Sequence, residues 1–169
     1  MLWIEDKFEK EVVDALSSQL SVSHLLTKFL LARGITQFKE AINFISPRLA
    51  HLSDPFEIPG MTEAVKRVVN AIENKENILL IGDYDVDGIT STVIVKKNLI
   101  SLGLTPYHVT PKRKSEGYGL TQEVLDRGLQ VESIDLVIAL DCGTNSIEES
   151  EFLSASGIDL IVIDHHQSK

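Results

Sequence analysis

Three short runs of apolar residues constrain the fold of this chain more than any other feature. They are ILLIG at 78–82, LVIAL at 136–140 and LIVI at 160–163. Each run is apolar at consecutive positions, without the alternation of a half-exposed strand. Such runs are typical of strands in parallel sheets, because helices cover both faces of those sheets. A weaker strand is expected at 107–110.

Helical patterns lie between these expected strands. The spacing of apolar residues predicts helices at 62–76, 90–102, 121–127 and 146–157. Ser146 and Glu149 have the spacing of a capping box at the start of the last of these helices. The alternating order predicts an α/β fold, in which a doubly wound and mostly parallel sheet carries helices on both faces.

The N-terminal part of the chain has a different pattern. Apolar residues recur at helical spacing through 7–52, and a connector with two prolines follows at 51–60. We therefore predict an N-terminal helical region with its connector at 1–60 and an α/β domain at 61–169.

The composition excludes several classes of protein. The 25 Asp and Glu residues outnumber the 16 Lys and Arg residues, and the net charge of −9 excludes a generally basic nucleic-acid coat protein. The single cysteine, Cys142, excludes a disulfide framework and a multi-cysteine zinc site, and we expect it to be a small buried side chain. Since no apolar run reaches the ~18 residues of a membrane span, and no signal peptide is recognisable, we expect a cytoplasmic protein that does not bind membranes.

Acidic residues follow all three apolar runs. The side chains concerned are Asp83, Asp85 and Asp87 after the first run, Asp141 after the second, and Asp164, His165 and His166 after the third. Ligands of open parallel sheets bind at the carboxyl ends of the strands. We therefore expect five aspartates and two histidines to meet at one edge of the sheet.

Such a cluster indicates divalent metal ions. Neighbouring carboxylates repel one another, and some of them would be protonated unless cations were bound. Asp oxygens mixed with His nitrogens suit Mn²⁺, Mg²⁺ or zinc-like ions, and the number of ligands is enough for two ions about 4 Å apart, as in two-metal phosphoester hydrolysis. Thr90 or Ser91 could also present helix N-terminal amides to a phosphate.

Each group taken alone has a simpler explanation. The run from Asp83 to Asp87 could be a solvated loop that caps a helix, and Asp141 could be an ordinary loop residue. The pair of His165 and His166 could lie on the surface or in the core. The metal interpretation depends on all three groups following buried strands.

The assembled motifs resemble those of the DHH phosphoesterase superfamily. The matching stretches are GDYDVDGITS at 82–91, ALDCG at 139–143 and VIDHH at 162–166. Within that superfamily, EGYGL at 116–120 and SPRLAHLSDPFEIPGM at 46–61 resemble the RecJ family of bacterial exonucleases. The resemblance covers nearly the whole chain.

This resemblance implies a site with two divalent ions, Mn²⁺ or Mg²⁺. The metal ligands that it implies are Asp85, Asp87, Asp141 and His165, and the catalytic residues are Asp83, Asp164 and His166. Asp141 would bridge the two ions, His166 would face the scissile phosphate, and Asp164 would hold the histidine pair. Asp83 would support the ligands or add to them.

The stretch that contains EGYGL resembles the substrate-side loop of the family. There Arg113 could pair with a phosphate, Tyr118 could stack on a base or sugar, and Gly119 belongs to the same substrate-binding motif. The alternative for Arg113 and the lysines beside it is a solvated run of charges.

The function that the resemblance implies is metal-dependent hydrolysis of single-stranded DNA from 5′ to 3′, in DNA repair or recombination. We expect a monomer, with single-strand binding protein and a helicase as candidate partners. The family has a fourth-motif aspartate and a second domain beyond the position of Lys169, so we expect an N-terminal fragment that is inactive or weakly active alone. The alternatives are a phosphoesterase acting on short oligonucleotides, cyclic dinucleotides or pyrophosphate, and a non-catalytic replication scaffold on the same fold.

Overall fold

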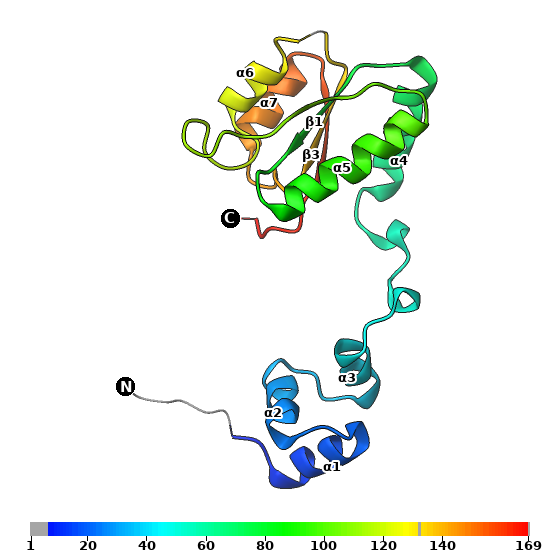
Figure 1. Ribbon diagram of the computed structural model, residues 1–169, viewed down its shortest axis with the longest axis vertical. Coiled ribbons are helices and arrows are strands. Elements are labelled where there is room, and N and C mark those ends of the chain that lie inside the picture. The colour runs from blue at the N-terminus through cyan, green and yellow to red at the C-terminus, as the bar shows by residue number, and fades with distance from the viewer. Residues whose placement is uncertain (1–6, 132, 169) are drawn as a thin grey trace. The chain divides into compact units, whose positions relative to one another are not determined.

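A computed structural model describes residues 7–131 and 133–168. The chain divides into two compact units, residues 1–57 and residues 58–169. Figure 1 shows that the first unit is helical and that the second contains the sheet.

The described residues of the first unit form a cluster of three α-helices. They are α1 (Lys10–Leu20), α2 (His24–Ala32) and α3 (Phe38–Ile45), and the short 3₁₀ turns Leu49–His51 and Pro55–Glu57 follow them. Helix α2 begins where the side chain of Ser23 accepts a hydrogen bond from the N–H of Leu26, at 3.3 Å. The helices bury one apolar core, made of Val13, Leu16, Leu20, Leu30, Leu31 and Ala41. This arrangement confirms the helical region expected before the sheet.

The second unit is built on a parallel sheet of four strands. They are β1 (Ile78–Gly82), β2 (Tyr107–Val109), β3 (Leu136–Leu140) and β4 (Asp159–Ile163). The strand order is β2-β1-β3-β4, and every pair is parallel. Gly82 lies opposite Leu140, and Leu140 lies opposite Ile163, so β1, β3 and β4 end level with one another. The loops that follow these three strands therefore leave the sheet at one edge.

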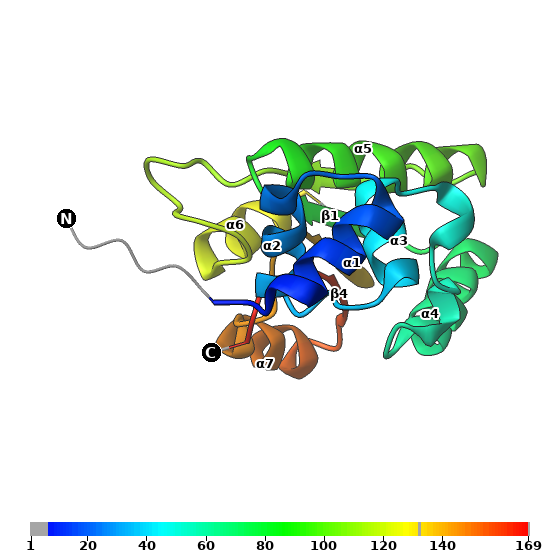
Figure 2. The ribbon, with the colours of Figure 1, turned by 90° about the horizontal axis from the view of Figure 1, so that it is seen from below.

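Helices cover both faces of this sheet, as predicted. Helices α4 (Met61–Asn74) and α5 (Val86–Ser101) lie on one face, and α6 (Gln122–Gly128) and α7 (Ile147–Ala155) lie on the other (Figures 1 and 2). Successive strand residues enter opposite cores, because side chains of a strand alternate between its faces. Leu80 packs on the α4 and α5 side, whereas Leu79 packs on the α6 and α7 side. In the described ranges, no helix combines the length and the apolar character needed to cross a membrane.

The start of α5 differs from the prediction. The helix begins at Val86 rather than at residue 90, because the side chain of Asp85 caps it. Thr90 and Ser91 consequently lie inside the helix, where their hydroxyls donate to the carbonyls of Val86 and Asp87. The expectation that Thr90 or Ser91 presents free helix N-terminal amides is therefore wrong.

The start of α7 also differs. Ser146 makes no capping hydrogen bond to the helix, and its hydroxyl instead donates to the carbonyl of Leu120 at 2.7 Å. The predicted capping box is therefore absent here. The serine joins α7 to the segment before α6, which is a tertiary contact that local sequence spacing does not reveal.

Candidate metal centre

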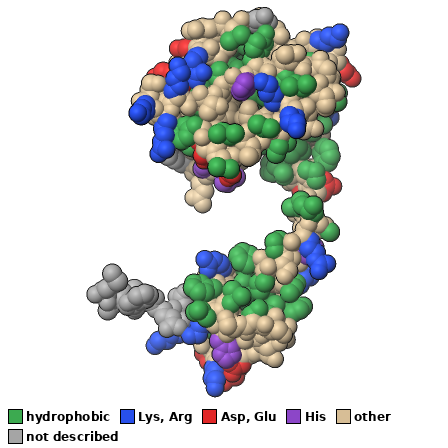
Figure 3. Space-filling model, viewed as in Figure 1, with side chains coloured by type: hydrophobic (Ala, Val, Ile, Leu, Met, Phe, Trp, Pro, Cys, Tyr) green, Lys and Arg blue, Asp and Glu red, His purple; other side chains and the backbone are tan. Residues whose placement is uncertain are grey.

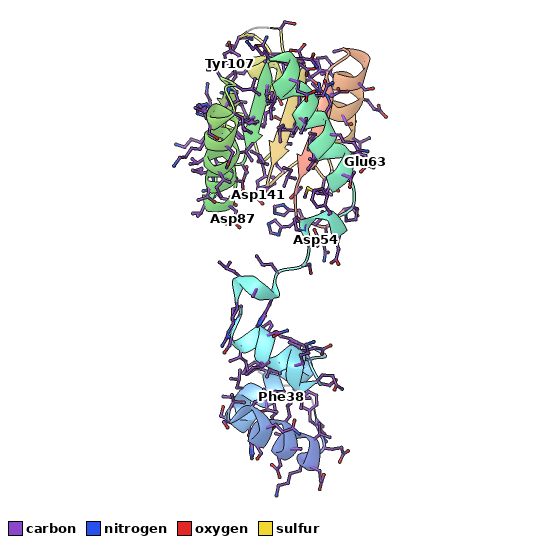
Figure 4. The ribbon with its side chains drawn as sticks, turned by 90° about the vertical axis from the view of Figure 1, so that its right-hand side faces the viewer. Phe38, Asp54, Glu63, Asp87, Tyr107 and Asp141 are labelled. Carbon is purple, nitrogen blue, oxygen red and sulfur yellow. The ribbon has the colours of Figure 1, made fainter. Side chains whose placement is uncertain are left out.

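The three strand ends place their acidic residues side by side. The backbone pairing of the sheet continues one residue beyond the strands, with the N–H of Asp83 donating to the carbonyl of Leu140 at 3.3 Å. In the same way, the N–H of Asp141 donates to the carbonyl of Ile163 at 2.8 Å. Figure 4 shows Asp87 and Asp141 at one end of the second unit and Tyr107, the first residue of β2, at the other. The predicted meeting of the strand ends is thus present.

Asp83 is the most deeply buried acid of this cluster. Its side chain is 0% exposed, and one carboxylate oxygen accepts a hydrogen bond from the N–H of Gly119 at 3.3 Å. The other oxygen, Oδ2, has no hydrogen-bond partner among the described residues. A buried carboxylate oxygen without a hydrogen-bond partner is costly, and a bound cation relieves that cost.

Asp85 holds the start of α5 and faces the neighbouring strand end. Its side chain accepts a hydrogen bond from the N–H of Gly88 at 3.0 Å. That hydrogen bond lowers the pKa of Asp85, and a hydrogen bond with Asp141 acts in the same direction. Asp87 lies one residue into the helix and is exposed. It lines a cleft of about 950 Å³ together with Asp141 and His165.

Asp141 is held in an uncommon backbone conformation. Its φ is 61°, in the left-handed region that few residues other than glycine adopt, and Asp and Asn are the best tolerated of those. The residue is 6% exposed, and its Oδ1 lies 3.1 Å from Nε2 of His165. Burial, followed by the nearby carboxylate of Asp85, raises the pKa of Asp141. Two acidic side chains in contact, one of them buried, favour a bound cation.

Asp164 orients His166. Its Oδ1 lies 2.7 Å from Nδ1 of His166 and also accepts that residue's backbone N–H at 3.1 Å, while its Oδ2 accepts the N–H of Thr144 at 3.1 Å. Burial alone would raise the pKa of Asp164, but the hydrogen bonds from Thr144 and His166 outweigh burial and bring the pKa well below its usual range. The hydrogen bond to Asp164 in turn raises the pKa of His166.

Aromatic and cationic side chains flank the cluster on its α6 side. The hydroxyl of Tyr118 lies 3.0 Å from Nε2 of His166, and burial together with nearby carboxylates, that of Asp83 first, raises the pKa of Tyr118 to about 12. Tyr118 is therefore a neutral phenol at physiological pH. The ring of Tyr84 makes an edge contact with Tyr118 at 6.1 Å between centroids, and the Arg113 guanidinium lies 5.4 Å from the Tyr84 centroid.

The other predicted substrate residue, Gly119, is buried, because its N–H serves Asp83 rather than an open surface. Cys142 is also buried, and its Sγ lies 3.7 Å from the carbonyl oxygen of Ile81. Burial and the Asp83 carboxylate raise the pKa of the Cys142 thiol to about 12. A buried thiol of this kind is inert, in agreement with the structural interpretation of this cysteine.

The donor atoms present fit a divalent metal ion. Ligand atoms of Asp141, His165 and His166 all lie within 4.8 Å of one another. Asp85 contacts Asp141, and Asp83, which follows the neighbouring strand β1, carries a buried oxygen without a partner among the described residues. Carboxylate oxygens with imidazole nitrogens are donors suited to Mn²⁺ and, where oxygen dominates, to Mg²⁺.

Sequence reasoning missed two residues of this site. Thr144 fixes Asp164 through its backbone N–H, and Tyr84 joins Arg113 to Tyr118. Tyr84 lies between Asp83 and Asp85 in the sequence, and this position alone could have indicated that it belongs to the site. Thr144 acts through its backbone, which carries no signal in its side chain.

Comparisons with known proteins agree with this geometry. Residues 77–169 match the DHH family, N-terminal domain. The chain is 33% identical over 167 residues to the single-stranded-DNA-specific exonuclease RecJ of Bacillus subtilis, covering 99% of this chain and 21% of that protein. The chain thus spans about a fifth of the length of this curated relative.

Solved structures of similar proteins include two that contain manganese. A crystal structure of exonuclease RecJ bound to manganese has a TM-score of 0.58 and 37% identity, covering 65% of this chain and 28% of that one. A structure of RecJ in complex with Mn²⁺ from Thermus thermophilus has a TM-score of 0.64 and 26% identity, covering 94% of this chain and 22% of that one. The family match over residues 77–169 includes all three strand ends of the cluster, and the chain belongs to the DHH family.

Proposed function

We propose that this chain carries the metal-binding side of an exonuclease site that degrades single-stranded DNA from 5′ to 3′ with two divalent ions, Mn²⁺ or Mg²⁺. The observation that carries this proposal is the convergence of Asp85, Asp141, His165 and His166 at one sheet edge. The relatives named single-stranded-DNA-specific exonuclease support the choice of substrate. We place the activity in cytoplasmic DNA repair or recombination.

The ligands proposed for the ions are Asp85, Asp87, Asp141 and His165. Bound there, divalent ions would supply positive charge that stabilises the negative charge developing on a phosphodiester during hydrolysis. The buried position of Asp141 strengthens this effect, because electrostatic interactions grow as water is excluded.

The chain's own side chains orient the substrate and hold protons. Asp164 keeps a proton on Nδ1 of His166 and leaves Nε2 directed towards Tyr118 and the cleft of about 360 Å³ beside it. The contacts of His166 with Asp164 and Tyr118 fix the plane of its imidazole, and neither partner is a proposed metal ligand. Such an orientation lets His166 face the phosphate that is cleaved.

A single strand suits this edge better than a duplex. Tyr84 and Tyr118 offer aromatic surfaces, and Arg113 offers a guanidinium group beside them. Unpaired bases can stack on such rings, and the guanidinium can pair with a phosphate. Bases of a duplex are already stacked on one another, so the same contacts would require the helix to open.

The test uses the protein at its full natural length with Mn²⁺ and 5′-labelled or 3′-labelled DNA. We expect single strands to be shortened from the 5′ end and duplexes to persist. Asp85→Asn and Asp141→Asn should abolish cleavage, whereas Asp126→Asn, at an exposed position on α6, is the matched control. Cleavage that survives Asp85→Asn and Asp141→Asn would reject the assigned site.

The cleavage assay, together with Mn²⁺ calorimetry, separates the alternatives. An enzyme for small phosphoesters would hydrolyse an oligonucleotide of about 4 residues or a cyclic dinucleotide and leave a strand of about 16 residues intact. A scaffold would bind no Mn²⁺ in calorimetry and cleave none of these substrates. Either result would replace the proposed activity.

A further inference from the structure

Charge is unevenly distributed along this acidic chain. Residues 88–115 contain no Asp or Glu at all, although the chain has 25 such residues. The same stretch contains five of the chain's 16 Lys and Arg residues, namely Lys96, Lys97, Lys112, Arg113 and Lys114. Although the net charge of the chain is −9, it contains one long segment in which every Lys, Arg, Asp or Glu residue is a Lys or an Arg.

The fold gathers this segment on one side of the second unit. Helix α5 and strand β2 both adjoin β1, and Nζ of Lys96 lies 2.8 Å from Nδ1 of His108 on β2. Figure 3 shows Lys and Arg side chains spread over the face that carries α5 and the loop after β2. We call Lys96, Lys97, Lys112, Arg113 and Lys114 the basic surface.

These charges are available to a ligand. Lys97, Lys112, Arg113 and Lys114 are exposed. None of the ion pairs among the described residues involves a member of the basic surface. Burial and the neighbouring ammonium of Lys96 lower the pKa of His108, so this histidine is neutral at pH 7 and can accept a hydrogen bond from Lys96.

Arg113 joins the basic surface to the metal centre through aromatic contacts. Arg113 lies over the ring of Tyr84, Tyr84 contacts Tyr118, and the hydroxyl of Tyr118 reaches His166. Along α5, Lys97 lies ten residues after Asp87, which corresponds to about 15 Å of helix axis. A ligand that reaches from the metal centre to Lys97 is therefore several nucleotides long.

We propose that the basic surface binds the phosphodiester backbone of a single strand, at nucleotides beyond the phosphate held at the metal centre. This inference rests on the proposed function, because it assumes that the strand enters the site past Arg113. The physical reason is that a cluster of aspartates repels a polyanion except where ions are bound, so a long strand needs separate cations to hold it. Backbone contacts of this kind are independent of base sequence.

The test measures binding of a phosphorothioate-linked single strand of about 16 nucleotides in Mn²⁺, a linkage chosen so that the strand stays intact. The variant is Lys96→Gln with Lys97→Gln, and the control is Lys66→Gln with Lys75→Gln, at an exposed position of α4 and at its exposed C-terminal cap. We expect the variant to bind about tenfold more weakly at physiological salt, and the slope of log affinity against log salt concentration to fall by about 1.4. The control should match the unaltered protein, and a strand of about 4 nucleotides should not distinguish the two proteins.

Equal losses in variant and control, or an unchanged salt slope in the variant, would overturn the inference. A polyglutamate peptide that displaces the strand at equal concentration of charge would also overturn it, because it would assign the surface to an acidic protein. Parallel assays with an ordinary strand keep the two proposals apart. Cleavage without any binding difference would reject only the basic surface, whereas a binding difference without cleavage would reject only the exonuclease activity.

Discussion

The hydroxyl of Tyr118 lies 3.0 Å from Nε2 of His166, and Asp164 contacts the other ring nitrogen of the same histidine at 2.7 Å. His166 is therefore held at both nitrogens by residues outside the proposed ligand set. Its partners come from the loop before α6 and from the end of β4, so the orientation of the imidazole depends on how these two segments pack together.

Replacing Tyr118 by phenylalanine removes this hydroxyl and keeps the ring against Tyr84. We expect kcat to fall roughly fivefold to tenfold, because a hydrogen bond of this kind contributes about 1 kcal/mol. Mn²⁺ affinity should be unchanged, since the ligands keep their positions. Steady-state kinetics and calorimetry measure the two quantities, with Tyr107→Phe at the opposite end of the sheet as control. A rise in KM at constant kcat would instead assign Tyr118 to substrate binding.

Glu116 should make the stability of the protein depend on acid pH. The side chain of Arg127 at 2.7 Å, followed by the N–H of Lys112, lowers the pKa of Glu116 to about 2. Because the folded pKa lies below the ordinary value of about 4.3, the stabilisation is complete above that value and is lost as the pH falls towards 2. Glu116→Gln should therefore unfold more easily than the unaltered protein at pH 7. Urea titrations at a series of pH values should show this difference vanish near pH 2.

Gly88→Ala should destabilise the loop that carries Asp83 and Asp85. A Cβ at residue 88 would clash with the backbone carbonyl and amide of Asp83, and backbone atoms cannot yield as a flexible side chain can. We expect a loss of about 3 kcal/mol in the free energy of unfolding, at the upper end of overpacking effects. Val93→Ala, at an exposed position of α5, is the control in the same denaturant titration. Equal stability of the Gly88 variant would contradict this packing.

Mn²⁺ should stabilise the folded chain, and its removal by chelation should reverse the effect. An ion at about 100 times its dissociation constant adds about 2.7 kcal/mol to the free energy of unfolding. Asp141→Asn should abolish this gain, while the asparagine tolerates the left-handed backbone at φ 61°. Thermal unfolding with and without Mn²⁺ measures the difference. An undiminished gain in the variant would show that the ion binds elsewhere.

Much of this fold could be predicted because the relevant signals are continuous in the sequence. The apolar runs at 78–82, 136–140 and 160–163 are all strands or within strands, and their level ends follow from parallel register. A parallel sheet predicts that Asp141 and the residues after β4 share one edge, but the 3.1 Å contact between Asp141 and His165 is seen only in the structure.

The errors arose at contacts that the spacing of apolar residues does not record, one of them a local helix cap and the others tertiary contacts. The Asp85 side chain starts α5 four residues earlier than the apolar spacing indicates. The Ser146 hydroxyl bonds to Leu120 across the fold instead of capping its own helix. The role of Tyr84 depends on Arg113 and Tyr118, which lie about thirty residues away in the sequence, so no local pattern contains it.

The backbone N–H of Asp141 donates to the carbonyl of Ile163 on β4, one of the two edge strands of the sheet. Fraying of β4 would release this tether, and Asp141 could then relax out of its strained conformation and carry its carboxylate away from Asp85. The pairing of β4 with the sheet and the position of the Asp141 carboxylate are therefore coupled. Amide hydrogen exchange at Asp141 would measure how often β4 frays, because its N–H is protected only while it is bonded to Ile163.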